Sequence, residues 1–218
     1  MITWLRNTGA IFAFAIPATA FAPYGLKRAE AAVPPPPNPT VVEHARKVAM
    51  VYGLIEPRIT KLEPTEIHHL SEVIIEECEK DGVDPLFVLA VIDAESNFDI
   101  EAVSPTGARG LMQLVPSTFR DVSDAKRMFD PEDNVRAGIR YIRKLWDAGY
   151  GRRGGPESIL LAYNQGPNMA SAVFRNGANM PNEAHIYIPR VMARYKALLA
   201  GQGFEPKDAK KLFLLAMR

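Results

Sequence analysis

Hydrophobic side chains recur at helical spacing along most of the chain beyond residue 40. In the clearest stretch, from Thr65 to Gly82, apolar positions repeat at i, i+3, i+7, i+8 and i+11. These positions are Ile67, Leu70, Ile74, Ile75 and Cys78. Residues at such intervals share one face of a helix, so the stretch predicts an amphipathic α-helix with the single cysteine buried on its apolar side.

The same periodicity predicts helices over residues 40–54, 130–148, 157–163 and 183–200, a short helix from Pro116, and an amphipathic helix over residues 206–218. Residues 99–113 and 151–156 carry proline and glycine and predict loops. No stretch alternates apolar and polar residues over a useful length, so two or three short strands near residues 107–115 are the most β structure expected. The expected fold class is therefore all-α, mainly helical.

Residues 86–95 form a different kind of helix, because eight of these ten residues are apolar. A helix that is apolar nearly all round lies inside a core. Asp84 and Pro85 suit its N-cap and first helical position, and Ser96-Asn97 ends it. The stretch thus predicts a buried helix that delivers Glu95, at its last turn, to a cleft.

Glu95 has the setting that a general acid requires. Apolar surroundings and the negative end of a helix dipole both disfavour the ionised carboxylate, so its pKa is expected to be raised. A carboxyl group that stays protonated near neutral pH can donate a proton to a reacting group. The alternative reading is a solvated glutamate at an ordinary helix end.

Composition and charge narrow the class of protein. The chain has 218 residues, 47% hydrophobic and 23% charged, as in an ordinary soluble globular domain with short additions. Its formal net charge is +1 and it has no strong Lys/Arg cluster, so no nucleic-acid partner is expected. The single cysteine, Cys78, excludes an internal disulfide.

The first residues have the order of a secretory signal peptide, with Arg6 before an uncharged apolar stretch over residues 9–22. Small-x-small cleavage sites end at Ala20 and Ala31, and we assign residues 1–31 to the signal peptide. A retained N-terminal anchor is the alternative. Residues 32–40 form a proline-rich linker and residues 41–65 a helical lead-in. The expected location is the periplasm or cell envelope.

Three short motifs follow in order along the chain. They are Glu95-Ser96-x-Phe98, Gly110-Leu111-Met112-Gln113 and Ala162-Tyr163-Asn164-x-Gly166. Each is weak alone, but the ordered set resembles the soluble lytic transglycosylase family, bacterial enzymes with a lysozyme-like catalytic domain that cleave peptidoglycan glycan strands. The resemblance implies a catalytic domain over residues 66–200 and leaves residues 201–218 as a C-terminal amphipathic tail.

The resemblance also implies residue roles. Glu95 would be the single acid/base that cleaves the β-1,4 bond between N-acetylmuramic acid and N-acetylglucosamine, leaving 1,6-anhydromuramic ends without consuming water. Tyr187 matches a tyrosine that hydrogen-bonds the catalytic glutamate, although Glu183-Ala184 replaces the Glu-Thr common before it. The positions that would bind substrate are Ser96, Met112, Gln113, Tyr163, Asn164 and Tyr187.

Two other function classes remain open at this point. A lysozyme-like hydrolase or chitinase on the same fold would need a second carboxylate. Asp93 should point away from Glu95 on the helix, and Asp99 and Glu101 lie in a polar loop where solvation is the expected role. A non-catalytic glycan-binding module would have no need of a glutamate with a raised pKa.

Neither a metal nor an organic cofactor is expected. His68 and Glu72 on one helix supply at most two ligands, and the chain has no phosphate-binding glycine loop. The expected partner is the peptidoglycan glycan strand. The basic, amphipathic C-terminal tail could contact either the domain itself or a membrane or envelope complex.

Overall fold

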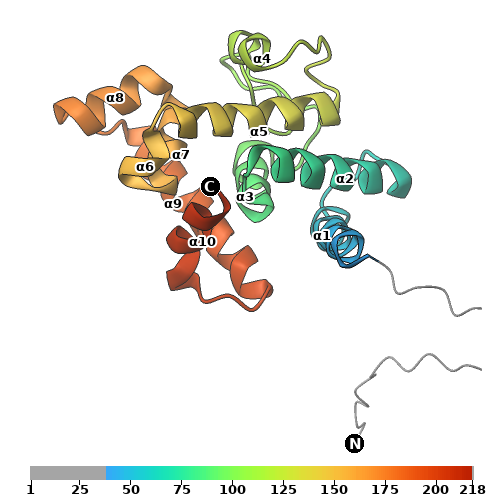
Figure 1. Cartoon of the computed structure of the whole chain (residues 1–218). Coiled ribbons are helices and arrows are strands. Elements are labelled where there is room, and N and C mark those ends of the chain that lie inside the picture. Colours follow the sequence, from blue (N-terminus) through green and yellow to red (C-terminus); the bar gives the residue numbers. More distant parts are fainter. Residues whose placement is uncertain (1–37, 218) are drawn as a thin grey trace, which may run out of the picture. The chain divides into compact units, whose positions relative to one another are not determined.

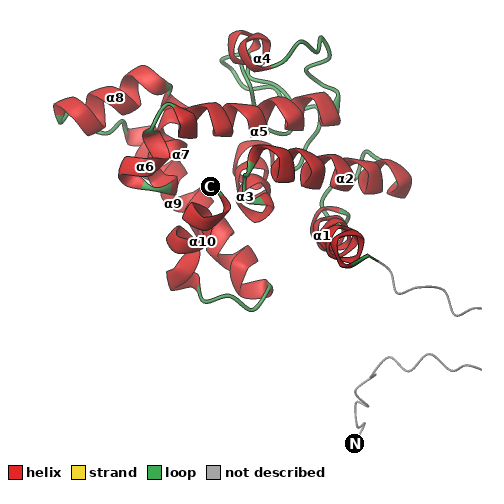
Figure 2. Ribbon diagram, viewed as in Figure 1, coloured by secondary structure: helices red, strands yellow, loops and turns green. Residues whose placement is uncertain are grey.

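The computed structural model describes residues 38–217, and the expected signal peptide and most of the proline-rich linker lie outside them. Within this range the secondary structure is helical, connected by loops and turns (Figure 1 and Figure 2). The helices are α1 (Pro39–Ile55), α2 (Pro64–Asp81), α3 (Pro85–Ser96), α4 (Pro116–Val122), α5 (Pro131–Asp147), α6 (Tyr150–Gly154), α7 (Pro156–Gln165), α8 (Pro167–Asn176), α9 (Asn182–Gly201), the 3-10 helix η1 (Pro206–Asp208) and α10 (Ala209–Ala216).

Proline opens most of these helices. It occupies the first helical position of α1, α2, α3, α4, α5, α7, α8 and η1. Proline is favoured there because its φ angle is already helical and its missing N–H would have no partner within the helix. The sequence places the helix starts unusually well for this reason, and the all-α expectation is confirmed.

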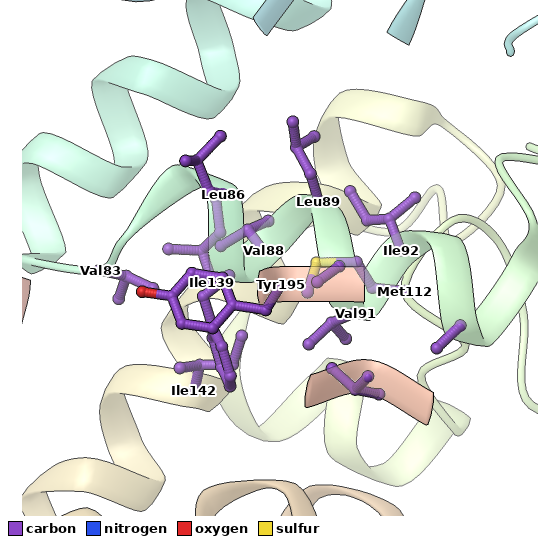
Figure 3. Close-up of a cluster of buried hydrophobic side chains, with 14 of the residues drawn as sticks. Val83, Leu86, Val88, Leu89, Val91, Ile92, Met112, Ile139, Ile142 and Tyr195 are labelled. Atoms are coloured by element: carbon purple, nitrogen blue, oxygen red, sulfur yellow. The ribbon is translucent and has the colours of Figure 1, made fainter. Parts of the chain in front are cut away.

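The core is organised around α3. Every residue from Leu86 to Ile92 is buried, and α3 packs most extensively against α9. Figure 3 shows the α3 side chains meeting Met112, Ile139 and Tyr195 from other parts of the chain. A helix enclosed in this way fixes the position of its C-terminal end, where Glu95 lies.

The predicted helices are present, with ends that shift by a few residues. The loop expected over residues 151–156 is wrong, since residues 150–154 form the short helix α6. The backbone of Gly151 packs so closely on the Trp146 ring that an added Cβ would lie 2.2 Å from a ring carbon. Glycine here serves close packing rather than a turn, and periodicity alone does not reveal that. Helix α8 was not predicted.

No β-strand forms in the part of the chain that the structure describes. Two isolated bridges join Arg109 to Val103 and to Leu114, within the loop where a small sheet was allowed. No helix among residues 38–217 is long and apolar enough to span a bilayer.

The C-terminal tail packs on the domain. Its residues Ala209, Phe213 and Met217 are buried, and the Phe213 ring lies 4.7 Å from that of Phe87 in α3. Of the partners left open for the apolar face of this tail, the domain itself is the one observed.

Candidate active site

Glu95 lies at the last turn of α3, where the helix ends as the sequence predicts. Asn97 adopts a left-handed conformation with φ of 51°, and its N–H donates to the carbonyl of Asp93. Phe98 also has positive φ, at 65°. Positive φ at two successive non-glycine residues costs conformational free energy. Arg58 stabilises the bend by donating to the Asn97 side chain at 2.8 Å and by stacking over the Phe98 ring.

The Glu95 carboxyl is largely removed from water but opens on a cleft. Burial is the main cause that raises its pKa from 4.5 to about 7. The Tyr187 hydroxyl, which donates to Glu95 Oε1 at 2.5 Å, and the nearby Arg190 charge both act in the opposite direction. Burial of Tyr187 raises the pKa of its own hydroxyl far above the usual range, so it remains a donor.

Helix α9 holds both ends of α3. At the N-terminal end, the hydroxyl of buried Tyr195 donates to Asp84 at 2.5 Å, and Asp84 also caps the helix through the N–H of Leu86. At the C-terminal end, Arg190 donates to the carbonyl of Ala94, the residue before Glu95. The same helix therefore positions the acid and supplies its tyrosine partner.

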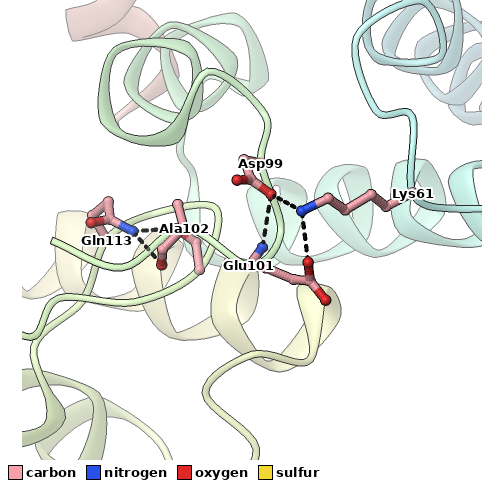
Figure 4. Close-up of polar contacts among 6 residues, drawn as sticks. Lys61, Asp99, Glu101, Ala102 and Gln113 are labelled. Atoms are coloured by element: carbon pink, nitrogen blue, oxygen red, sulfur yellow. Dashed lines mark hydrogen bonds and ion pairs between the residues drawn. The ribbon is translucent and has the colours of Figure 1, made fainter.

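Gln113 forms part of a second wall, built by the loop between α3 and α4. It has positive φ, and its amide nitrogen donates to the carbonyls of Ala102 and Gly110 at 3.0 and 2.9 Å, as Figure 4 shows in part. Both amide hydrogens are thus used within the loop. The side-chain carbonyl oxygen of Gln113 is left as the acceptor for a ligand.

Asn134 in α5 anchors this loop. It is fully buried, accepts from the N–H of Met112 at 2.8 Å, and donates to the carbonyls of Arg109 and Met128. A Cβ on Gly110 would lie 2.6 Å from the Asn134 amide nitrogen, so only glycine fits there. The sequence predicts only that Asn134 lies in the first turn of the helix over residues 130–148, and it does not reveal this anchoring contact.

The cleft between these walls has a volume of about 330 Å³. Helix α7 contributes Tyr163 and Asn164, and α5 contributes Tyr141, whose ring lies 5.3 Å from that of Tyr163. The lining residues are Glu95, Ser104, Thr106, Ala108, Gln113, Leu114, Val115, Thr118, Tyr141, Tyr163, Asn164, Gly166, Pro167 and Glu183. Aromatic rings, hydroxyls and amides beside one buried acid are suited to a sugar ligand.

The structure brings four of the expected site residues to the cleft surface and holds three behind it. Glu95, Gln113, Tyr163 and Asn164 line the cleft. Tyr187 is buried and reaches the cleft only through its bond to Glu95.

The other two expected site residues lie outside this lining. Ser96 donates back to the carbonyl of Ile92. Met112 is a correction to the expected cleft-facing side chain, because it is fully buried and packs against Gly138. It contributes its carbonyl oxygen instead, which accepts from the Tyr163 hydroxyl at 2.7 Å.

Sequence reasoning missed the second carboxylate of the cleft, which is Glu183 at the start of α9. It accepts from the amide of Gln165 at 3.2 Å and lies 3.4 Å from that of Asn164. Its negative charge makes a small contribution to the raised pKa of Glu95. Only its place next to the Tyr187 motif could have signalled this role.

The carboxylates near Glu95 in sequence do not line the cleft. Asp93 is paired with Arg58 at 2.7 Å and with Arg194 at 3.2 Å. Asp99 and Glu101 are exposed and share the ammonium group of Lys61 (Figure 4). The expectation that these three groups have other roles agrees with their positions.

Larger hollows occur away from Glu95. One between α1 and α2 has a volume of about 600 Å³, but His44 and Lys47 in its lining are both paired with Glu79, and its other carboxylate, Glu43, is paired with Arg46. Among residues 38–217, no three His, Cys, Asp or Glu side chains come together as metal ligands. Size alone therefore does not single out a site, and the buried carboxyl with its raised pKa makes the Glu95 cleft the candidate.

Comparison with known proteins agrees with this geometry. The family described as the transglycosylase SLT domain matches residues 72–186. The membrane-bound lytic murein transglycosylase C of Haemophilus influenzae is 30% identical over 147 residues, covering 61% of this chain and 39% of that protein. The protein of the same name from Sodalis glossinidius is 36% identical over 112 residues, 45% of this chain and 31% of that protein.

A solved structure shares the fold. The 70-kDa soluble lytic transglycosylase of Escherichia coli superimposes with a TM-score of 0.55 at 19% identity, over 75% of this chain and 31% of that one. The chain spans about a third of the length of these relatives. Because the family match covers more than half of its residues, the chain belongs to the transglycosylase SLT-domain family, with its all-α, lysozyme-like fold.

Proposed function

We propose that this protein is a lytic transglycosylase that cleaves the β-1,4 bond between N-acetylmuramic acid and N-acetylglucosamine in peptidoglycan. The observation that carries the proposal is Glu95, a carboxyl with a pKa of about 7 at the end of a rigid apolar helix, open to a cleft lined with aromatic rings and hydroxyls. A general acid works best when its pKa lies near the operating pH.

Glu95 acts first as acid and then as base. Its carboxyl proton passes to the glycosidic oxygen as the C1–O bond breaks, and N-acetylglucosamine leaves with a free hydroxyl. The muramoyl C6 hydroxyl then attacks C1 and gives its proton to the Glu95 carboxylate. The proton donated in the first step is thereby returned, no water enters, and the product carries a 1,6-anhydro ring.

Tyr187 stabilises the ionised carboxylate of Glu95 between these two steps. Its hydroxyl already donates to Glu95 Oε1 at 2.5 Å, and a hydrogen bond to an ionised acceptor is stronger than one to a neutral acceptor. Gln113 and Asn164 would bind sugar hydroxyl and acetamido groups, and Tyr163 would present its ring. Ser96 and Met112 would act indirectly, through the helix end and the loop.

Product mass tests the reaction. Intramolecular transfer adds no mass to the cleaved strand, whereas hydrolysis adds one water and leaves a reducing end. Digestion of purified peptidoglycan should give anhydromuramic ends as the main product by mass spectrometry. Reducing ends as the main product would contradict the transglycosylase assignment.

Glu183 supports a second candidate, a lysozyme-like hydrolase, because it places another carboxylate on the same cleft. In that reaction Glu183, rather than Asp99 or Glu101, would activate the attacking water. Glu183→Gln separates the two. A transglycosylase keeps its anhydro product after this change, whereas a hydrolase loses its reducing-end product.

The location proposed for the protein is the cell envelope, where peptidoglycan lies. Two relatives are named membrane-bound murein transglycosylases, and residues 1–31 carry the signal-peptide pattern. Residues 66–200 are the proposed catalytic domain. The exposed lysines of the tail, Lys207, Lys210 and Lys211, are the proposed surface for a membrane or envelope contact. N-terminal sequencing of envelope material tests export, since an intact Met1 would favour the retained anchor.

A further inference from the structure

The segment between α1 and α2, residues 56–63, contacts the end of α3 that carries Glu95. The segment precedes residues 72–186, which the family match covers. Within it, Ile59 is only 3% exposed, and the N–H groups of Arg58 and Ile59 both donate to the carbonyl of Ile55, at 2.9 and 3.0 Å. The backbone that carries the Arg58 side chain is therefore held by a turn and by the core.

The Arg58 guanidinium contacts the chain both before and after Glu95. One terminal nitrogen donates to Asp93 Oδ1 at 2.7 Å and to the side-chain oxygen of Asn97 at 2.8 Å. The same group lies 4.7 Å from the centre of the Phe98 ring. Asp93 is only 14% exposed, so solvent screens this ion pair less than it screens a pair at the open surface. The three contacts together depend on a planar group with several donors, which arginine has and lysine lacks.

The bend that Arg58 spans is conformationally unfavourable. Asn97 and Phe98 have φ angles of 51° and 65°. Asparagine tolerates positive φ, but a bulky residue such as phenylalanine rarely adopts it. A conformation of this kind persists only where the surrounding contacts impose it. Without Arg58 the bend can relax, and the last turn of α3, which carries Glu95, loses one of its restraints.

Resting on the function proposed above, we infer that Arg58 is a positioning residue for the reaction, which holds the end of α3 so that the Glu95 carboxyl keeps its place in the cleft. Arg58 does not line the cleft, so it acts through Glu95 and not on the substrate. Helix α9 restrains the same turn through Arg190, which donates to the carbonyl of Ala94. Loss of Arg58 should therefore displace the turn without unfolding it. The segment ahead of the family's domain then supports the active site and is more than a spacer.

The pH–rate profile separates this role from two others. The titratable and charged groups around the Glu95 carboxyl are Tyr187, Arg190, Glu183 and Arg194 on α9, Tyr163 on α7, Tyr141 on α5, and Asp93 and Arg58 near its own turn. A relaxed bend admits water to the carboxyl, so its pKa should fall from about 7 toward 4.5, and the alkaline limb, where activity falls as pH rises, should move to lower pH. Loss of the Arg58 cation acting through charge alone would raise the same pKa and move the limb to higher pH. A smaller folded fraction alone would leave the limb in place.

Arg58→Ala tests the inference on soluble glycan strands. We expect kcat to fall about 10-fold, KM to change less than about twofold, and the alkaline limb to move to lower pH, because a misplaced acid loses rate more than binding. A limb that is unmoved or moved to higher pH, or a loss confined to KM, would overturn the inference. Arg58→Lys keeps the charge pair with Asp93 and loses the planar contacts, so it should fold and show a smaller loss, about 2- to 5-fold, with the same direction of the limb. A lysine variant equal to the wild type would also overturn the inference.

Two matched variants remove a cation elsewhere. Lys61→Ala changes the same segment, but the carboxylates that pair with Lys61 are exposed, so kcat should change less than about twofold. Arg140→Ala removes one partner of the buried Glu77 between α2 and α5, while Arg136 remains as another. This variant should lower the stability of the fold and leave kcat per folded protein and the alkaline limb unchanged. If it reproduced both effects of Arg58→Ala, those effects would reflect general destabilisation, and the inference would be overturned.

A direct titration separates failure of the inference from failure of the proposed function. The NMR resonance of the Glu95 carboxyl carbon, identified by its absence in Glu95→Gln, should titrate near pH 7 in the wild type and at lower pH in Arg58→Ala. The same titration in both proteins would overturn the inference, while anhydro ends in the wild-type product would still support the function. A lower pKa in Arg58→Ala together with reducing ends as the main wild-type product would contradict the function and not the positioning role.

Discussion

Two carboxylates, Glu95 and Asp99, lie within a few residues of each other and behave in opposite ways. Glu95 ends a helix inside the core, and burial raises its pKa to about 7. Asp99, in the loop that follows, is exposed, and its hydrogen bond to Lys61 lowers its pKa. Solvation and the charge of the partner thus decide which group can serve as an acid near neutral pH, and closeness in sequence does not.

The rigidity of the two regions differs as well. Glu95 is held by an apolar helix that α9 fixes at both ends, through Tyr195 and Arg190. Asp99 is held by a lysine side chain that is itself 46% exposed. A proton donor must keep its geometry to within a fraction of an ångström, which the first setting provides and the second does not.

Removing each carboxyl should give the largest contrast. Glu95→Gln keeps the shape of the side chain but cannot transfer a proton, so glycan cleavage should fall at least ~10²–10⁴-fold. Asp99→Asn should change the rate less than about twofold, because the group lies outside the cleft. Rates are measured on purified peptidoglycan, with circular dichroism as the check on folding. An active Glu95→Gln protein would contradict the assignment of the acid.

The pH dependence should sharpen the contrast. Because the reaction begins with protonated Glu95, activity should fall as pH rises through about 7. This fall is the alkaline limb of the pH–rate profile. Tyr187→Phe removes the hydrogen bond that favours the ionised form of Glu95, so the alkaline limb should move to higher pH while kcat falls about 10-fold. Tyr163→Phe is the matched control, since its hydroxyl bonds to the Met112 carbonyl and its loss should leave the limb in place.

The position of the alkaline limb shows whether Tyr187 changes the pKa of Glu95 or has only a structural role. A merely structural tyrosine would lower the rate equally at every pH. An unshifted limb in Tyr187→Phe would therefore show that the 2.5 Å bond does not tune the acid.

The sequence predicts features that depend on neighbouring residues better than features that depend on residues far along the chain. Asp84, Pro85 and Asn97 are local signals, and they place α3 and its acid correctly. The partner of the acid, Tyr187, lies 92 residues away and was available only through resemblance to a family. The sequence did not reveal that Glu183 lines the cleft, because a polar residue at a helix start has the same pattern whether or not it faces a cavity.

Two other differences arise from packing, which a residue pattern does not show even between residues close in sequence. Gly151 looked like a loop signal because its close contact with the Trp146 ring forms between two consecutive helices, α5 and α6. Met112 looked like a cleft residue because the family resemblance assigns the motif around it to the site, although its side chain packs in the core against Gly138 and only its backbone reaches the cleft residue Tyr163. Motifs identify a functional segment, whereas packing decides which atoms of that segment meet the ligand.

The smallest effect expected from the same comparison is on stability, and its sign should differ between the two sites. The folded-state pKa of Glu95 is raised, so the folded form loses stability as pH rises from 4.5 to about 7, where only the unfolded chain ionises. Glu95→Gln escapes this loss. Above pH 7 it should raise the free energy of unfolding by on the order of 1–3 kcal/mol, less whatever the Tyr187 bond contributes, and should match the wild type near pH 4.

Asp99→Asn should instead lower the free energy of unfolding near neutral pH. Its folded-state pKa is lowered, so the native carboxylate stabilises the fold above its unfolded pKa, and that contribution is lost as pH falls through the folded value. Screening of an exposed pair keeps the effect below about 1 kcal/mol, and added salt should reduce it further. Urea unfolding at pH 4 and pH 8 measures both variants. If the stability of Glu95→Gln relative to the wild type did not rise between pH 4 and pH 8, Glu95 would not have a raised pKa in the folded state, which would remove the physical basis for its role as the acid.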